Sequence, residues 1–527
     1  MQHPVPPPDL SILPPFHGVL FPPGMSGQSA GPAGSADCFT DLNLDQVVGA
    51  AVGKGDEADL HPVFHAPLRD EAVIRYRQAI FADLRRPDGA APFGPFRDAM
   101  RSVRAGLAYA DRTGPSPQQD AIILHTALAY RAAVEALLAG LRRAPISSPG
   151  LLGLRDHLIA YLHSPPFVAF AAEAASVQTG LEAIEYATLF RDDTVTVRPC
   201  AGEPDDAVTV RERFARFQGG PAVPDPPPSP PRGTDISLNH VEAAILGFVA
   251  RLFPAPFAAL RTFAARHGSF MDGTLVRLDR EIGFFLGFLA VMAPLERAGL
   301  PFCTPRVSAS DRTMVITGCF DLALAIRLAR EGCPLVLNDA ALRDGERLMV
   351  VTGPNQGGKT TFARALGQLH VLAALGCPVP AKQAHLFLPD QVLTHFERSE
   401  DIANLRGKLE DELVHLRRSC DAATANSLVI LNEVFNSTGL DDQAFLSREI
   451  LERIAASGAA CICVTFLDEL STLDDRTVSM VSSVSAEDPA VRTFAIRRRP
   501  ADGLAFALSL AERRGLTLPQ LRTRLRP

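Results

Sequence analysis

Apolar residues recur at helical spacing through two long stretches of this chain. They recur at near-helical spacing within residues 40–190, and they form one stripe over residues 238–253, within a second stretch that runs from residue 237 to about residue 300. This period is that of an amphipathic helix. Residues 120–141 and 151–162 continue it. The marker residues are Ile74, Ala79, Ile80, Leu84, Leu238, Val241, Ile245, Val249 and Phe253. We therefore expect both stretches to be mainly helical.

The period changes at two places. Residues 194–198 and 207–210 read Thr-Val-Thr-Val-Arg and Ala-Val-Thr-Val, which predicts two short strands joined by a polar turn. From about Pro334 onward, short apolar runs alternate with helical segments. That alternation is typical of a parallel sheet covered by helices on both faces. The predicted fold class is a multidomain chain in which an all-α core and lever region precedes an α/β domain.

Proline-rich segments divide the chain. Residues 1–36 are rich in Pro, Gly and Ser, and we expect them to lack fixed structure at the tip. Residues 219–233 hold seven prolines, which predicts a semi-rigid exposed connector. The expected segments are 1–39 (Pro/Gly-rich), 40–218 (helical core with a β-hairpin near 194–210), 219–234 (Pro-rich linker), 235–333 (helical lever) and 334–527 (α/β domain). No internal repeat is evident.

Composition excludes several classes of protein. A chain of 527 residues is too long for one core, and its nine cysteines show no C-x-x-C pair, which indicates a reduced, cytoplasmic protein. The N-terminus does not have the pattern of a signal peptide, and no uninterrupted apolar run approaches ~18 residues. A net charge of −7 argues against a generic polycation that coats nucleic acid. Residues 491–527 nevertheless carry nine arginines and two acids, which suit phosphates or, equally, a solvated helix face.

A glycine loop joins an apolar strand to a helix-compatible segment at residues 348–361. The run matches G-x-x-x-x-G-K-[ST], a phosphate loop whose backbone N–H groups turn toward phosphate oxygens at a helix N-terminus. We expect Lys359 to contact the β- and γ-phosphates and the Thr360 hydroxyl to bind Mg²⁺. An ordinary glycine-rich turn is the alternative. The predicted ATP-binding residues are Gly353, Pro354, Asn355, Gln356, Gly357, Gly358, Lys359, Thr360 and Thr361.

Two later apolar runs end in polar residues that suit the same site. Residues 427–431 lead to Asn432 and Glu433, where nucleotide hydrolases place an acid for Mg²⁺ and a glutamate that orients water. We expect Glu433 to be the general base and Asn432 to reach Mg²⁺ through a bound water. The amide supplies no negative charge, so we expect weaker Mg²⁺ binding and slow turnover. Thr465 ends the run 460–465 and could sense the γ-phosphate. The alternatives are a solvent-facing carboxylate for Glu433 and a turn cap for Thr465.

In order and spacing, these motifs resemble the MutS family of DNA-repair ATPases, relatives of the ABC-type ATPases, across most of residues 334–475. The phosphate-loop block with Gly-Pro-Asn and the later V-P-A turn carry the most specific part of the resemblance. The matching segments are 337–339 at the opening strand, 352–360, 376–381 as the G-x-x-V-P-A turn, 399–412 as the D-D segment and dimer signature, 427–433, 436–438, and 464–470 as the switch region; residues 65–70 resemble the opening of the helical core domain.

The chain departs from the family pattern near the nucleotide. Asn432 stands where the family has Asp, Phe466 where it has His, and Gly407 where it has Ser, followed by Lys408 and Leu409 where it has Thr and Phe. Residues 335–337 are aliphatic where an adenine-stacking aromatic is expected. The Asn-Glu pair is similar to a bacterial MutS-like subgroup without the mismatch-reading N-terminal domain. The resemblance therefore implies slow hydrolysis and no standard mismatch wedge.

The resemblance also implies partners and cofactors. It implies ATP and Mg²⁺ as cofactors, and a homodimer in which Arg406, Gly407 and Glu412 of each chain face the partner's phosphate loop. DNA, recognised by structure rather than by sequence, is the implied ligand. The expected activity is weak, DNA-dependent hydrolysis of ATP to ADP and phosphate by a clamp related to repair or recombination.

Two other functions remain open at this point. Asn432 and Phe466 also suit a nucleotide-gated protein-interaction or regulatory module with little or no ATPase activity. A small-molecule kinase would need an acceptor-binding lid, and the extended helical half of this chain does not resemble one.

Overall fold

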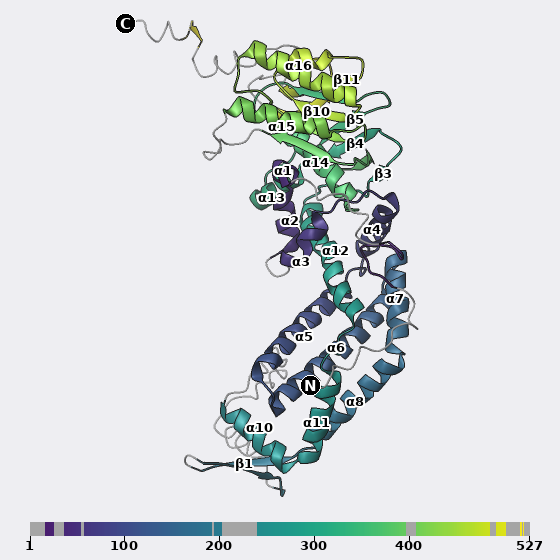
Figure 1. Cartoon of the computed structure of the whole chain (residues 1–527), viewed down its shortest axis with the longest axis vertical. Coiled ribbons are helices and arrows are strands. Elements are labelled where there is room, and N and C mark those ends of the chain that lie inside the picture. Colours follow the sequence, from purple (N-terminus) through teal and green to yellow (C-terminus); the bar gives the residue numbers. More distant parts are fainter. Residues whose placement is uncertain are drawn as a thin grey trace, which may run out of the picture. The chain divides into compact units, whose positions relative to one another are not determined.

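The computed structural model describes residues 16–25, 36–53, 57–191, 194–202, 240–396, 407–484, 492–501, 517, 518 and 520. The chain forms two compact units, each described by itself below (Figure 1). The helical unit comprises Met1–Phe16, Asp88–Ile146 and Leu152–Asp279, and the sheet unit comprises His17–Pro87, Ser147–Leu151 and Arg280–Pro527. The last passage of the chain from the helical unit to the sheet unit falls within helix α12 (Gly273–Arg297).

Long helices build the helical unit, as the apolar period predicted. They are α5 (Phe93–Thr113), α6 (Pro117–Arg143), most of α7 (Pro149–Leu162), α8 (Pro165–Glu182), α10 (His240–Leu252) and α11 (Pro254–His267). Ser116 begins α6 by accepting a hydrogen bond from the Gln119 amide at 3.2 Å, directly before a proline at the first helical position. Helix α6 packs along α5 and against α11. Phe170 stacks on Phe263 with ring centroids 6.1 Å apart, which joins α8 to α11.

A single hairpin is described in the helical unit. Strand β2 (Thr194–Pro199) contains the predicted strand 194–198, and it pairs antiparallel with the preceding β1 (Tyr186–Arg191). The second predicted strand, 207–210, lies outside the described residues, as do the proline-rich linker 219–234 and residues 1–15.

Helix α6 has the length and mean hydropathy of a membrane span, and half of that stretch is buried. Helices α10 and α11 together would meet the same test, but they are bent by 109° at the break between them. Within α6, Arg131 forms an ion pair with Glu135 at 2.8 Å. Burial on one side and an ion pair on the other are features of a core helix in a globular unit.

Six strands form the larger sheet of the sheet unit. Their order is β12 (Arg492–Arg498), β11 (Thr477–Val484), β6 (Leu348–Thr352), β10 (Ala460–Val464), β9 (Leu428–Asn432) and β8 (Val392–Phe396). All neighbours pair in parallel except β11 and β12. The central strand β6 is buried along its whole length, as expected for a strand covered on both faces.

Helices cover both faces of this sheet, as predicted. Val429 and Leu431 of β9 pack in one apolar cluster with Leu416 of α15 (Lys408–Ala422) and Leu451 of α16 (Leu440–Ser457). Ile430, the residue between them, faces Gly367 of α14 (Lys359–Ala374). A Cβ added to Gly367 would lie 2.7 Å from the Cδ1 methyl group of Ile430. Alternate residues of one strand therefore meet helices on opposite faces.

A second sheet of four strands belongs to the same unit. Its order is β3 (Arg306–Ser308), β7 (Gln383–Phe387), β4 (Met314–Cys319) and β5 (Asn338–Leu342), and α13 (Leu322–Glu331) follows β4. Strands β3 and β4 lie within residues 235–333, for which the sequence analysis expected helices alone. They are short, and their partner β7 lies more than sixty residues further along the chain, so no local pattern marks them.

The sheet unit also includes helices from early in the chain. They are α1 (Ala36–Asp41), α2 (Leu44–Val52), α3 (Glu57–Phe64) and α4 (Glu71–Leu84). Arg77 of α4 is fully buried and donates to the backbone carbonyls of Leu20 at 3.0 Å and Leu375 at 3.1 Å. Gly376 has φ +79°, and a Cβ there would lie 2.7 Å from the Arg77 Cβ. The glycine of the G-x-x-V-P-A turn thus allows α4 to approach the end of α14.

Candidate nucleotide site

The phosphate-loop residues lie between the buried strand β6 and the N-terminus of α14. Gly353 follows the strand with φ +115°, Gly358 precedes the helix with φ +87°, and Lys359 is the first helical residue. An added Cβ on Gly353 would lie 3.0 Å from the Ser482 carbonyl oxygen, and one on Gly357 would lie 2.3 Å from the Ser482 hydroxyl. Glycine is therefore needed both for the left-handed backbone and for the close approach of β11. A strand, this loop and a helix N-terminus together form a phosphate-binding geometry.

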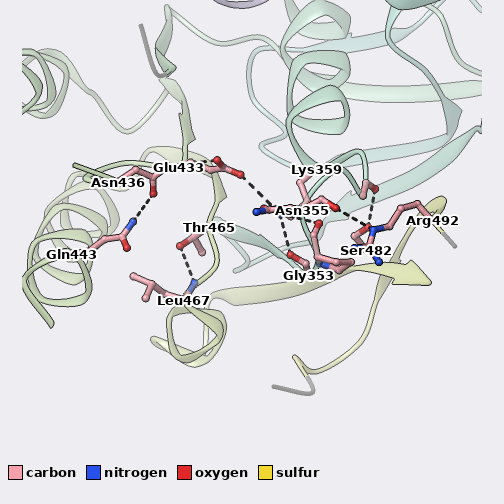
Figure 2. A network of polar contacts seen from close by, with 12 residues as sticks. Gly353, Asn355, Lys359, Glu433, Asn436, Gln443, Thr465, Leu467, Ser482 and Arg492 are labelled. Atoms are coloured by element: carbon pink, nitrogen blue, oxygen red, sulfur yellow. Dashed lines mark hydrogen bonds and ion pairs between the residues drawn. The ribbon is translucent and has the colours of Figure 1, made fainter. Parts of the chain in front are cut away.

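Lys359 is almost fully buried at the centre of the site (Figure 2). Its Nζ donates to the backbone carbonyls of Gly353 at 3.0 Å and Pro354 at 3.2 Å, and it lies 4.1 Å from the centre of the Phe466 ring. Burial lowers the pKa of Lys359 to about 8, even though the carboxylate of Glu433 acts to raise it. The ammonium group is thus positioned by the loop itself and faces an aromatic ring.

Glu433 points toward this lysine (Figure 2). Its Oε1 lies 3.9 Å from the Lys359 Nζ, and its Oε2 is 3.5 Å from the Asn436 side-chain amide. The Glu433 amide donates to the Val464 carbonyl at 2.8 Å, which holds the end of β9 against β10. The carboxylate is therefore directed at the phosphate loop and is not merely a solvent-facing residue at a strand end.

Asn432 ends β9 and is buried, and among the described residues its side-chain Oδ1 has no hydrogen-bond partner. A buried amide oxygen without a partner is costly unless a bound group satisfies it. Such an oxygen can accept from a metal-bound water, so Asn432 and the Thr360 hydroxyl at the start of α14 fit the role predicted for Mg²⁺. Within the described ranges, no cluster of three or more His, Cys, Asp or Glu side chains could hold a metal by itself.

Thr465 follows β10 and is buried. Its amide donates to the Val351 carbonyl at 3.1 Å, and its hydroxyl accepts from the Leu467 amide at 3.1 Å (Figure 2). These contacts are those of the turn cap that the sequence analysis kept as the alternative. Sensing of the γ-phosphate by Thr465 stays a prediction.

The three predicted signature residues have different outcomes. Arg406 lies outside the described residues. Gly407 is exposed at the start of α15. Glu412 is mostly buried, and its Oε1 accepts from the Phe435 amide of its own chain at 2.8 Å. Their expected contact with a partner chain stays a prediction, and the contact of Glu412 within the chain is a new observation.

Comparison with known proteins now bears on this geometry. The model of MutS domain V matches residues 349–507, which include the phosphate loop, Glu433 and the strands β9–β12. The same region matches DNA mismatch repair proteins.

Residues 349–507 form a MutS domain V.

The MutS relatives match part of the chain. "DNA mismatch repair protein MutS 2" of Halobacterium salinarum is 40% identical over 142 residues, which are 27% of this chain and 16% of the relative. "DNA mismatch repair protein MutS" of Exiguobacterium sp. is 34% identical over 146 residues, 28% of this chain and 17% of the relative. The protein of the same name from Brevibacillus brevis is 32% identical over 232 residues, 44% of this chain and 26% of the relative. Each alignment thus spans about a quarter or less of the relative.

The MutS-family site also contains residues that sequence reasoning missed. The Ser482 hydroxyl donates to the Gly357 carbonyl at 2.7 Å, and the Arg492 Nε donates to the Asn355 carbonyl at 3.1 Å (Figure 2). Phe494 is half-exposed, has φ +56° and lies beside Gly358. The Asn338 side chain donates to the Phe494 carbonyl at 3.1 Å. No spacing signal could have found these residues, because Ser482 and Arg492 lie 125 and 137 positions from their loop partners.

Proposed function

We propose that this chain is an ATP-binding MutS-like protein that binds DNA and hydrolyses ATP slowly. The observation that carries the proposal is the Glu433 carboxylate 3.9 Å from the buried Lys359 of the phosphate loop. A general base beside a phosphate-binding cation is the arrangement that nucleotide hydrolysis requires. The match to MutS domain V supports the same conclusion.

The chain's own residues have distinct roles in this proposal. Backbone N–H groups of residues 355–361 hold the phosphates, and Lys359 neutralises their charge. Glu433 orients and deprotonates the attacking water. Thr360, and Asn432 through a water, would hold Mg²⁺, which when bound neutralises charge on the β- and γ-phosphates. Because Asn432 is neutral, we propose that Mg²⁺ binding and turnover are weaker than with a carboxylate at this position.

At the level of the molecule, we propose a cytoplasmic homodimeric clamp that recognises the structure of DNA rather than its sequence. The relatives' names, which describe DNA mismatch repair proteins, support DNA as the ligand. Branched or damaged DNA is the proposed preference. The nine cysteines, which form no C-x-x-C pair in the sequence, suit a reducing compartment.

A test begins with retention of labelled ATP at millimolar Mg²⁺. We expect the wild type to retain ATP and Lys359→Ala to lose most of this retention. Lys382→Ala, which removes an exposed lysine of the same unit, is the matched control and should behave as wild type. Equal retention by Lys359→Ala and the wild type would contradict the site.

Turnover is then measured with duplex, mismatched, flap and four-way-junction DNA, and without DNA. Stimulation by one branched form supports the clamp. A rate at background with every form, with ATP still bound, would favour the second candidate, a nucleotide-gated protein-interaction module. Two observations support this second candidate: Asn432 is neutral, and the Phe466 ring lies against the Lys359 ammonium group.

A further inference from the structure

The loop after β9 has an unusual backbone. Glu433 and Phe435 both have positive φ, +51° and +59°, with Val434 between them. Left-handed backbone is unfavourable for residues other than glycine, above all for a bulky residue such as Phe435, whose side chain is fully buried. Such a conformation persists only where surrounding contacts determine it, and it tends to occur at functional sites. The backbone that presents Glu433 to Lys359 is therefore held from outside the loop.

Three separate elements hold three consecutive residues of this loop. The Glu433 amide donates to Val464 of β10 at 2.8 Å. The Val434 carbonyl accepts from the Gln443 side chain of α16 at 2.9 Å. The Phe435 amide donates to the Glu412 carboxylate of α15 at 2.8 Å. Of these three bonds, the one to Glu412 is the only one with an ionised partner, and charge-assisted bonds are the stronger kind.

The Glu412 carboxylate is itself oriented by a histidine. Its Oε1 lies 3.2 Å from the Nε2 of His395 on β8, and because a carboxylate can only accept, His395 donates from Nε2. The His395 Nδ1 in turn lies 3.1 Å from the Nδ1 of His415, which follows Glu412 by about one turn of α15. Both Glu412 and His395 are mostly buried. A carboxylate fixed by a ring on the neighbouring strand has little freedom to leave the Phe435 amide.

We propose that Glu412 is a positioning residue for Glu433 within its own chain. It holds the Phe435 amide, and thereby keeps Glu433 aimed at the phosphate loop. This inference rests on the proposed hydrolysis. It differs from the expectation that Glu412 serves the phosphate loop of a partner chain. A group that must be aimed to about 1 Å can lose on the order of 100-fold in rate when its support is removed.

Two substitutions at position 412 separate positioning from general damage. We expect Glu412→Ala to lower single-turnover hydrolysis about 100-fold while the Kd for ATP changes less than about twofold, because the phosphate loop is untouched. Glu412→Gln keeps an acceptor for the Phe435 amide and should recover to within about tenfold of the wild type. Glu410→Ala, an exposed glutamate in the first turn of the same helix, is the control. Loss of ATP affinity in parallel with rate, or no loss of rate, would overturn the inference.

Hydrogen exchange at the Phe435 amide gives a readout that needs no turnover. Glu412→Ala should speed exchange in peptides covering residues 433–436 by about tenfold or more, and Glu412→Gln should preserve most of the protection. A wild type that hydrolyses no ATP would refute the proposed activity alone. Unchanged exchange in Glu412→Ala would refute the positioning role whether or not ATP is hydrolysed.

Mixed dimers decide between action within the chain and action on a partner. A wild-type chain paired with a Lys359→Ala chain has one intact site and sets the reference rate. If Glu412 acts within its chain, the rate of Glu412→Ala paired with Lys359→Ala should fall far below this reference, since one site then lacks a correctly aimed Glu433 and the other lacks Lys359. A rate equal to the reference would overturn the inference in favour of action across the dimer. If the protein stays monomeric, the defect of Glu412→Ala alone is already a defect within the chain.

Discussion

At the scale of single residues, the site depends on Lys359, whose side chain is buried away from water. The pKa of Lys359 is lowered to about 8, chiefly by burial and also by the neighbouring Arg492, while Glu433 and Asp468 act to raise it. A phosphate next to the ammonium group would favour the charged form and raise the pKa again. Binding of nucleotide and of a proton to Lys359 are therefore coupled.

This coupling predicts how ATP binding depends on pH. Below pH 8 Lys359 is charged, and affinity is at its maximum. As the pH rises above about 8, the free lysine loses its proton, so we expect ATP to bind up to roughly tenfold more weakly per pH unit and to take up a proton. Calorimetry at pH 9 in two buffers of different ionisation enthalpy measures the uptake. Lys359→Arg is the control, because a guanidinium does not titrate in this range. Identical heats in both buffers for the wild type would contradict the prediction.

Asn432 carries a second prediction at the same scale. Its buried Oδ1 without a partner suits a metal-bound water, but it supplies no charge. We expect Asn432→Asp to lower the Mg²⁺ concentration for half-maximal hydrolysis about tenfold and to raise turnover, since a carboxylate attracts the cation. Asn426→Asp, an exposed change at the other end of β9, adds the same charge away from the site. If Asn432→Asp lowered both quantities, the amide would have a different role.

At the scale of elements, β11 supports the phosphate loop from the side. It runs parallel to β6, and its Ser482 hydroxyl holds the Gly357 carbonyl where the register of β11 with β12 shifts. The glycines at 353 and 357 leave just enough room for this serine. The loop conformation is thus set by a strand that follows it by more than a hundred residues.

Removal of this contact should weaken nucleotide binding. We expect Ser482→Ala to raise the Kd for ATP about fivefold, the equivalent of about 1 kcal/mol for one buried hydrogen bond. Ser479→Ala on the same strand is the matched control, because the buried Ser479 hydroxyl makes no hydrogen bond to any residue that the structure describes, and its loss should not change ATP binding. Fluorescence titration with an ATP analogue measures both variants. Equal effects of the two changes would show that the Ser482 contact does not support the loop.

At the scale of the whole molecule, we propose that nucleotide binding at the candidate site controls dimer formation, and that the dimer binds DNA. Apolar side chains on α16 are exposed in the single chain, among them Leu440 and Phe445. The family resemblance implies that ATP brings two sheet units together. Because the alignments cover about a quarter or less of each relative, the activity of the whole protein remains a proposal argued from one domain.

Nucleotide-driven association is the corresponding prediction. Light scattering of the wild type should rise toward the mass of a dimer when ATP and Mg²⁺ are added, and Lys359→Ala should abolish the rise. Lys382→Ala should retain it. An increase of the same size in Lys359→Ala would separate association from the phosphate loop and would remove the composite site from the proposal.

How far the sequence could predict the fold depended on the distance between interacting residues. The long helices and the alternating strands after Pro334 were predicted, since each is marked by a local period. The short strands β3 and β4 were missed because they pair with β7, far along the chain. For the hairpin, β2 was predicted, but its pairing with Tyr186–Arg191 was not, because polar turn residues occur on both sides of β2.

The same distinction holds for the candidate site. By itself, the sequence determined where the phosphate loop lies, because such a loop is built from contiguous backbone. It also determined that Asn432 and Glu433 lie at a strand end, because the apolar run of the buried strand stops there. Tertiary structure alone decided that Ser482, Arg492 and Phe494 line this loop and that Glu412 holds the Phe435 amide of its own chain. These contacts join elements far apart in the chain, and packing, which no local spacing encodes, determines which of them meet.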